Sequence, residues 1–179
     1  MHARLQDIEG FLAERRVEVL TAVATVPDAA HATVPAGTWS VAAILDHLRL
    51  TETSVSKMLH VTVSRLADGA RPPETDTGSV LHRLDHATLT NRDRRVQAPP
   101  MVQPRTDVAL PDALAALEAS RLALHGSMRE ADGIALGNFS YPHPVLGPLD
   151  LYQWLVFLGL HESRHASQIR ELGETRSDP

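Results

Sequence analysis

Apolar residues recur every three or four positions along four long segments of this chain, and this spacing restricts its fold more than any other feature. The segments cover about residues 3–26, 40–69, 111–131 and 150–173. Such a repeat places the apolar side chains on one face of a helix. Aromatic residues make up only 4% of the chain, and Ala, Leu and Val dominate its apolar set. This composition favours helices packed on helices, so the sequence predicts an all-α protein.

Local signals mark the ends of these helices. Ser40 is a residue type that caps helix N-termini, and Pro111 falls in a first turn, where proline is tolerated. Asp150 followed three positions later by Gln153 has the pattern of a capping box. Gly173 is a typical C-terminal stop. The sequence therefore predicts four separate helices.

The segment between the second and third helices, residues 70–106, is long for a loop inside a compact domain. A short helix is expected within residues 80–89. Pro99, Pro100 and Pro104 then keep the chain extended. Because a crossover of this length can span a bundle, we expect the second and third helices to be parallel neighbours.

The chain of 179 residues is long enough for one domain with a single core. We expect one four-helix-bundle domain over residues 1–179, without internal repeats. Residues 132–149 contain Gly and Pro and are expected to form a loop. No segment has the alternation that predicts a strand.

Charge and composition exclude several functions. The net charge is -5 and no basic stripe is present, so nucleic acid is not an expected partner. The densest basic run, residues 92–95, includes an acid and is interpreted as a surface turn. Residues 1–10 are not expected to act as a signal peptide, and the apolar run at residues 151–160 is too short for a predicted membrane span. We expect a cytoplasmic protein with no membrane partner, and its exposed Ala and Leu favour a homodimer.

The chain contains no cysteine. It therefore has no disulfide, no thiolate metal ligand and no cysteine nucleophile. Any thiol chemistry must take its sulfur from a small molecule.

His161, Glu162 and His165 match the H-E-x-x-H motif of zinc proteases. Such proteases generally need a third ligand downstream, and residues 166–179 contain no histidine. A helical bundle also lacks an edge strand on which to bind a peptide, which disfavours a protease. Glu162 projects about 100° away from His161, so it is interpreted as near a metal-bound water, solvent-facing or ion-paired. A di-iron bundle is disfavoured because inward Glu-x-x-His pairs are missing.

Around the last helix, His165 lies about 40° from His161, and Gln168 lies about 20° to the other side. All three point into the bundle. Two buried imidazoles need partners, and two at this spacing can share a metal ion. Core histidines bonded to backbone or water remain the alternative for an isolated pair.

A third histidine favours a metal site over core histidines bonded to backbone or water. His47 lies at the edge of the buried stripe of the second helix. If the bundle brings it level with the other two, three neutral imidazoles with an open fourth position suit zinc or another divalent metal. His82 and His86 are interpreted as a surface or lid pair. His143 is interpreted as part of a turn, with the mouth of the site as a second reading.

The chain resembles the DinB-like superfamily. The resemblance covers nearly the whole chain through the order of its helices, but its specific motifs lie in the second and fourth helices. The segment 143–149 before the last helix is similar to one branch of that family. The residues that carry the resemblance are Trp39, Ser40, His47, Leu48, His161, His165, Gln168 and, within the last helix, Trp154.

The resemblance implies a four-helix bundle in up-down-down-up order with the long crossover between helices 2 and 3. It implies a divalent metal (zinc, nickel or iron) bound by His47, His161 and His165. It also implies transfer or isomerisation with a low-molecular-weight thiol such as mycothiol or bacillithiol, or metal-dependent hydrolysis of a small molecule. Gln168 is expected to orient a ligand or an imidazole. A non-catalytic bundle that binds metal or a small ligand is the alternative.

Overall fold

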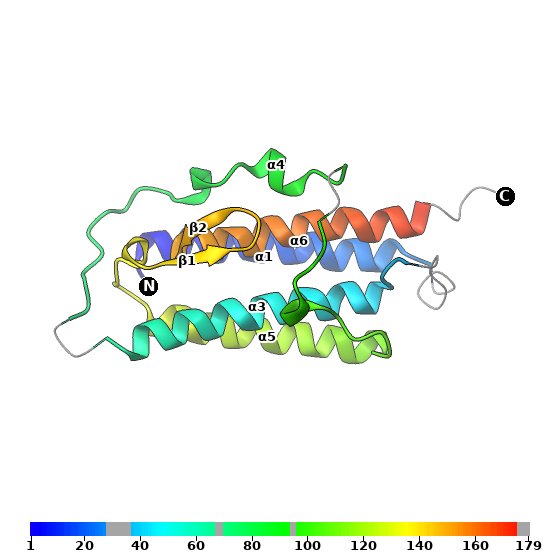
Figure 1. Cartoon of the computed structure of the whole chain (residues 1–179), viewed down its shortest axis with the longest axis horizontal. Helices are drawn as coiled ribbons and strands as arrows, with labels where there is room; N and C mark the ends of the chain where they lie inside the picture. Colours follow the sequence, from blue (N-terminus) through cyan, green and yellow to red (C-terminus); the bar gives the residue numbers. More distant parts are fainter. Residues whose placement is uncertain (28–36, 67–69, 94–95, 175–179) are drawn as a thin grey trace.

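The computed structural model describes residues 1–27, 37–66, 70–93 and 96–174, and four long helices dominate it (Figure 1). The long helices are α1 (Ala3–Thr25), α3 (Val41–Ser64), α5 (Leu110–Glu130) and α6 (Leu151–Glu174). The short elements are η1 (Leu81–Arg83), α4 (His86–Thr90), η2 (Pro100–Val102), η3 (Leu136–Asn138), β1 (Ser140–His143) and β2 (Gly147–Asp150). The expected all-α bundle is confirmed.

The expected helix signals act as predicted. Ser40 caps α3 by accepting a hydrogen bond from the Ala43 amide at 3.1 Å. Asp150 accepts from the Gln153 amide at 2.9 Å, while the Gln153 side chain accepts from the Asp150 amide at 2.9 Å. These reciprocal bonds form the capping box and satisfy two amides at the start of α6. The expected end of the second helix near Gly69 was too late, because α3 ends at Ser64; Gly69 itself lies outside the described residues.

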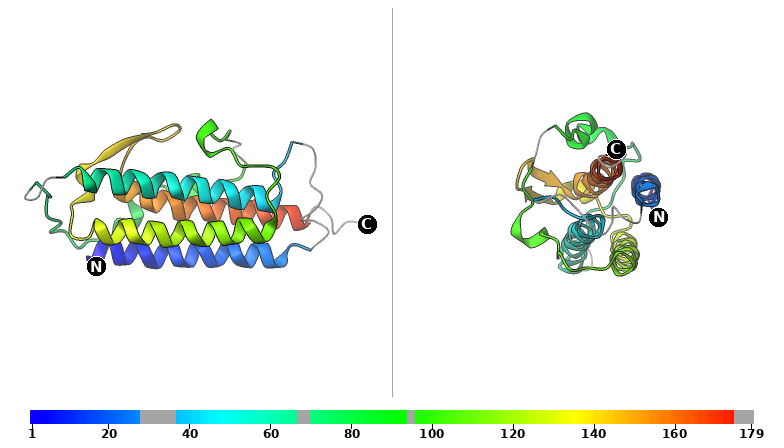
Figure 2. Two further views of the ribbon diagram at one scale, coloured as in Figure 1. Left: turned by 90° about the horizontal axis from the view of Figure 1, so that it is seen from below. Right: turned by 90° about the vertical axis from the view of Figure 1, so that its right-hand side faces the viewer.

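The helices run in up-down-down-up order. Ser56 on α3 lies 3.0 Å from Ser127 on α5, measured between hydroxyl oxygens. One turn further along α3, His60 contacts Glu130 at 2.6 Å. The contacting residue moves toward the C-terminus on both helices, from Ser56 to His60 on α3 and from Ser127 to Glu130 on α5, so the two helices are parallel neighbours. Figure 1 shows α1 and α6 running together in the opposite direction, and the end-on view of Figure 2 shows the four helices as one bundle.

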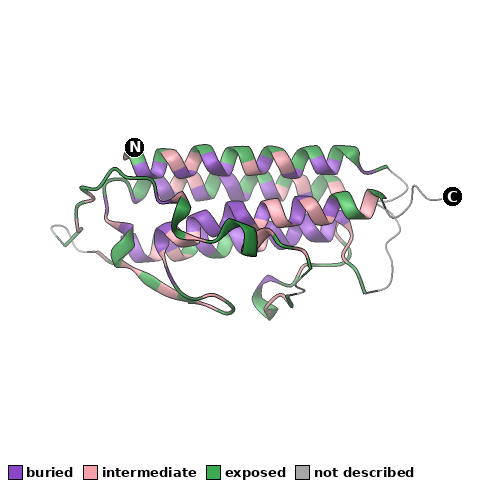
Figure 3. Ribbon diagram, turned by 90° about the horizontal axis from the view of Figure 1, so that it is seen from above, coloured by how far each residue is buried: buried purple, intermediate pink, exposed green. Residues whose placement is uncertain are grey.

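The core consists of two apolar clusters separated by a buried polar layer. One cluster includes the first half of α1 and of α6, and the other includes the second half of each. Between them lie four buried charged residues, one on each long helix: Arg16, Glu52, Arg121 and Glu162. Buried positions follow the inward faces of the helices (Figure 3). Within the described parts of the chain, every helix falls short of the length and apolarity that a membrane crossing requires.

The segment before α6 differs from the expectation. It was predicted to be a loop without strands, but β1 and β2 pair in an antiparallel hairpin. Pro142 faces Pro148 across this ladder. Because proline has no amide hydrogen to donate to a ladder, two prolines hide the strand pattern. Gly147 opens β2 with a φ of 77°, a conformation that glycine adopts at no steric cost.

The crossover packs against α3 and α6. Its short helices η1 and α4 occupy the predicted region near residues 80–89, and α4 packs on α6. Arg4 anchors the first part by donating to the carbonyl oxygen of Gly78 at 2.9 Å and to Glu74 at 2.9 Å. Further on, η2 packs on α3, on the same side of the bundle as the hairpin (Figure 2).

Candidate metal centre

Three histidines from two helices converge on one point. His47 lies in the second turn of α3, while His161 and His165 lie one turn apart on α6. The Nε2 atom of His161 is 3.2 Å from Nε2 of His47 and 3.1 Å from Nε2 of His165. The rings of His47 and His165 are almost fully buried, with 4% and 6% of each residue exposed. The structure therefore brings together the three ligands predicted from sequence.

Hydrogen bonds on the far side of two rings decide which nitrogen carries the proton. Nδ1 of His47 lies 2.6 Å from the carbonyl oxygen of Val102 in η2. A carbonyl oxygen only accepts, so Nδ1 donates and Nε2 keeps a lone pair. Nδ1 of His165 lies 2.8 Å from Oε1 of Gln168 and donates in the same way. Both rings thus direct an Nε2 lone pair toward His161.

These lone pairs test whether the site fits a metal ion. Nε2 of His161 can donate at most one hydrogen, so it satisfies at most one of the two facing lone pairs. A tetrahedral zinc ion with Zn–N bonds of about 2.0–2.1 Å holds its nitrogens roughly 3.3 Å apart. The observed separations of 3.1 and 3.2 Å are close to that spacing. The three side chains therefore fit a divalent cation.

Burial keeps the three rings in the neutral form that binds metals. Desolvation lowers the pKa of His47, lowers that of His165 to about 3, and lowers that of His161 well below its usual value. All three histidines line a cavity, where His161 is half-buried and His47 and His165 are buried. At neutral pH all three imidazoles are therefore available as ligands.

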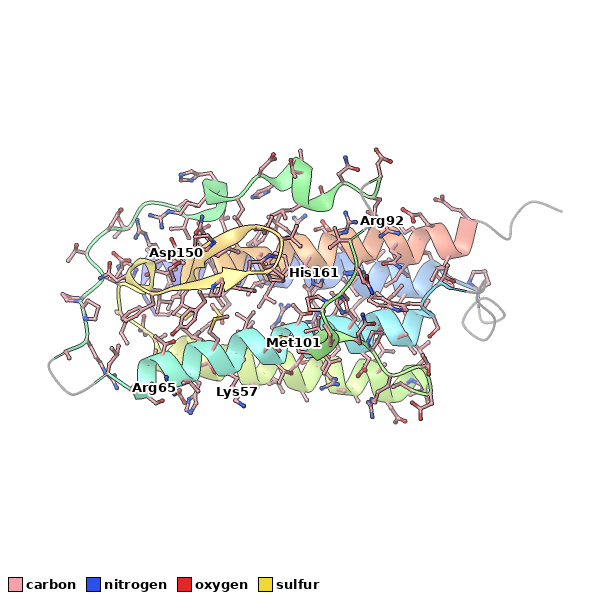
Figure 4. All side chains as sticks on the ribbon, in the orientation of Figure 1. Lys57, Arg65, Arg92, Met101, Asp150 and His161 are labelled. Atoms are coloured by element: carbon pink, nitrogen blue, oxygen red, sulfur yellow. The ribbon has the colours of Figure 1, made fainter. Side chains whose placement is uncertain are left out.

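A cavity of about 700 Å³ lies beside the histidines, enclosed by α3, α6, the hairpin and the crossover. Figure 4 shows His161 between the hairpin tip and η2, which carries Met101. Phe157 stacks on His161 with ring centroids 5.1 Å apart. His143 on β1 packs against Phe157 at 4.6 Å and against Trp154 at 5.0 Å. An aromatic wall thus extends from the histidines toward the hairpin, and His143 is part of the cavity lining.

Trp39 supports the other side of the centre. Its ring centroid lies 4.8 Å from His47 and 6.3 Å from His165, and it directly precedes the Ser40 cap. Thr51 faces the cavity one turn after His47, but its hydroxyl donates to the His47 carbonyl at 2.9 Å. Trp39 therefore packs beside two of the three histidines.

Glu162 is ion-paired, which is one of the roles that the motif left open. Its Oε1 accepts from Nε of Arg16 at 2.8 Å and from Nη2 of Arg121 at 3.0 Å. Burial raises the pKa of Glu162, and the charges of Arg121 and Arg16 oppose that rise. The carboxylate belongs to the polar layer of the core and does not line the cavity.

The second histidine pair lies away from the centre. His86 is exposed and contacts the carbonyl oxygen of Leu81 at 2.8 Å, and neither His82 nor His86 lines the main cavity. Arg92 and Asp93 form a bend, with Asp93 exposed, as expected for the basic run. Arg92 also lines the cavity and binds Glu171 through two hydrogen bonds of 2.9 and 3.2 Å, which the sequence did not indicate. Residues 94 and 95 lie outside the described residues.

Sequence reasoning missed several residues that complete the site. Val102 orients His47, Tyr141 lines the cavity from the hairpin, and Phe157 stacks on His161. Arg164 also lines the cavity, three positions after His161. For Phe157 and Arg164 the signal was helical spacing, because residues three and four positions from His161 share its side of α6. For Val102 and Tyr141 the sequence offers no such signal.

Comparison with known proteins finds a matching family model and a curated relative of this chain. A family model described as the DinB superfamily matches residues 12–169, a range that includes all three histidines. YuaE of Bacillus subtilis (strain 168), described as an uncharacterized protein, is 27% identical over 143 residues. That similarity covers 76% of this chain and 78% of YuaE. No solved structure matches the chain.

Proposed function

The chain belongs to the DinB superfamily, a metal-binding family, and on that premise we propose that it is a divalent-metal-dependent enzyme acting on a small molecule. The observation that carries the proposal is the convergence of three Nε2 atoms at 3.1 and 3.2 Å beside a cavity of about 700 Å³. His47, His161 and His165 would hold the cation, and the cavity would hold the substrate. Three protein ligands and a neighbouring cavity are typical of catalytic rather than structural zinc sites.

A divalent ion held by neutral ligands keeps its full charge, which lowers the pKa of a bound water toward ~7 and favours a thiolate over a thiol. The chain's own residues orient the site. The Val102 carbonyl and the Gln168 side chain fix the rings of His47 and His165. Partners of this kind outside the ligand set hold the tautomer that presents Nε2.

The finer proposal is a transferase or isomerase that uses a low-molecular-weight thiol such as mycothiol or bacillithiol, with hydrolysis of a small molecule as the other activity. The chain has no cysteine of its own, so a transferred sulfur must come from such a cofactor. In the transfer, the thiol sulfur bonds to an electrophilic carbon, and the leaving group departs with the proton that the thiol loses. The packed rings of Phe157, Trp154 and His143 would exclude water from the electrophile.

His143 would contribute a hydrogen-bond donor to this reaction. Its Nδ1 accepts from the amides of Val145 and Leu146, each at 3.2 Å. The proton of the neutral ring therefore resides on Nε2. Burial lowers the pKa of His143, so the ring stays neutral near pH 7 and donates through Nε2.

A second function, binding of metal or a small ligand without catalysis, is favoured by one observation. Among the described residues that line the cavity there is no Asp or Glu, so a carboxylate that could act as general base is missing. A binding module would need only the histidines and the apolar walls.

Turnover separates the two functions. Purified protein loaded with zinc, nickel or iron is mixed with a thiol and an electrophilic substrate, and loss of thiol is followed. We expect His165→Ala to lower turnover at least about a hundredfold and to lose the bound metal. His86→Ala, which removes an exposed histidine outside the cavity, should leave both unchanged. Metal binding without turnover across thiols and esters favours the binding module. Turnover that survives His165→Ala contradicts the assigned site.

A further inference from the structure

The main cavity is positively charged in an acidic protein. The described residues that line it include Arg92 and Arg164 but no Asp or Glu, whereas the whole chain carries a net charge of -5. The histidines in the lining add no negative charge, and a divalent cation bound to them would add two positive charges. Arg92, labelled in Figure 4, lies beside α6, where it binds Glu171.

The two arginines lie near each other at the crossover side of the cavity. Arg164 is half-buried on α6, and its Nη1 donates to the carbonyl oxygen of Asn91. Glu171 binds Arg92 in a bidentate pair. Two guanidinium groups at one side of the cavity attract an anion that enters it.

The rest of the lining is apolar. Met58 and Val55 on α3 face Phe157 and Trp154 on α6 across the cavity. At its outer edge, apolar side chains are exposed on separate segments: Met101 is 77% exposed on η2 and Val145 is 43% exposed at the hairpin tip. Exposed apolar residues that surround a cavity on two facing segments suit an apolar group of a ligand.

From this arrangement we infer that the cavity selects a small organic anion with an apolar body, such as an aryl or alkyl carboxylate. Arg164 binds the carboxylate, the charge of the neighbouring Arg92 attracts it, and the aromatic wall formed by Phe157 and Trp154 packs on the body. Guanidinium groups recognise carboxylates through paired hydrogen bonds, which gives both charge and geometric selectivity. The inference rests on the proposed function only in that it takes this cavity as the substrate site.

Two probes with the same aromatic body test the inference on the full chain. Anilinonaphthalene sulfonate carries a negative charge, and N-phenyl-naphthylamine is its neutral counterpart. Both are titrated by fluorescence against protein kept in chelator, so that a bound metal does not attract the anion. We expect one sulfonate site per chain, at least about tenfold tighter than the neutral probe, which corresponds to roughly 1.4 kcal/mol. Phenylbutyrate should displace the sulfonate, and phenylbutanol should not.

Matched variants assign the charge selectivity to a residue. Arg164→Gln should weaken sulfonate binding about tenfold and leave the neutral probe within about twofold. Arg170→Gln removes the same charge from an exposed position on the same helix outside this cavity, and it should change neither probe. If Arg164→Gln does not fold, Arg92→Gln serves as the second variant with the same expected pattern.

Equal affinity of the two probes, or an equal loss in Arg164→Gln and Arg170→Gln, overturns the inference. Because the titration is done without metal, its failure is separate from failure of the proposed function. If the protein selects the anion through Arg164 but binds no metal, this inference stands and the proposed enzyme function is wrong. If the protein binds metal but shows no selectivity for the anion, the inference is wrong and the proposed function is unaffected.

Discussion

The buried polar layer makes a quantitative prediction about stability. Glu52 accepts hydrogen bonds from Nη2 of Arg16 at 3.1 Å and from Nε of Arg121 at 2.5 Å, and it also binds Ser120. Only 3% of its side chain is exposed. In Glu52→Gln the amide NH₂ would face groups that are themselves donors, and the layer would hold two guanidiniums against the single carboxylate of Glu162.

The expected cost follows from this burial. Breaking a buried ion pair by neutralising one partner costs about 3–5 kcal/mol, because the remaining charge is left without compensation. For a chain of this size, each kcal/mol lowers Tm by about 2–4 °C. Glu52→Gln should therefore lower Tm by roughly 6–20 °C.

Chemical denaturation of the metal-free protein followed by circular dichroism measures this free energy. The matched control is Glu171→Gln, which breaks the pair with Arg92 at a carboxylate whose side chain is 50% exposed. Exposed pairs contribute about 0–1 kcal/mol, so the control should remain near wild type. If Glu52→Gln loses no more free energy of unfolding than Glu171→Gln, the polar layer does not stabilise the bundle as argued.

Three further predictions concern the site and α6. Gln168→Leu removes the acceptor of His165 Nδ1 and should weaken metal affinity about 10–100-fold in competition with a chromophoric chelator; unchanged affinity would refute the orienting role. The metal-free protein should lose stability as pH falls from about 6.5 toward 3, by up to about 1.4 kcal/mol per pH unit for each buried histidine. The sign follows because the pKa of His165 is lowered to about 3 in the folded state, so the unfolded chain binds more protons in that range; denaturation curves that coincide at pH 7 and pH 5 would contradict it. Asp150→Ala removes the cap of α6 and should cost about 0.5–2 kcal/mol, measured by thermal unfolding; an unchanged Tm would show that the capping box contributes nothing.

The four long helices and the part of the site on α6 could be predicted from the sequence because they depend on local spacing. A repeat of three and four places His161, His165 and Gln168 on one face of α6 whatever the rest of the chain does. The caps at Ser40 and Asp150 depend only on residues within the next turn. These predictions were therefore confirmed with small errors at the ends of the helices.

The remaining features depend on contacts between distant segments. Whether His47 meets the other two histidines is decided by how α3 is positioned along α6, and single-helix periodicity does not contain that information. The path of the crossover brings Val102 to His47 and Arg92 to the cavity. Two prolines facing each other concealed the hairpin. Arg121 is buried on α5, and its carboxylate partners lie on α3 and α6, which the spacing within one helix does not reveal.

The central claim is that His47, His161 and His165 bind one divalent cation through Nε2. X-ray absorption at the zinc edge of reconstituted protein measures the number and type of ligands directly. The account predicts three imidazole nitrogens at about 2.0–2.1 Å with the remaining position open to solvent or substrate. Loss of one imidazole in His47→Ala would identify the ligand from α3. A spectrum with fewer than three imidazoles in the wild-type protein, or no zinc retained at all, would contradict the account.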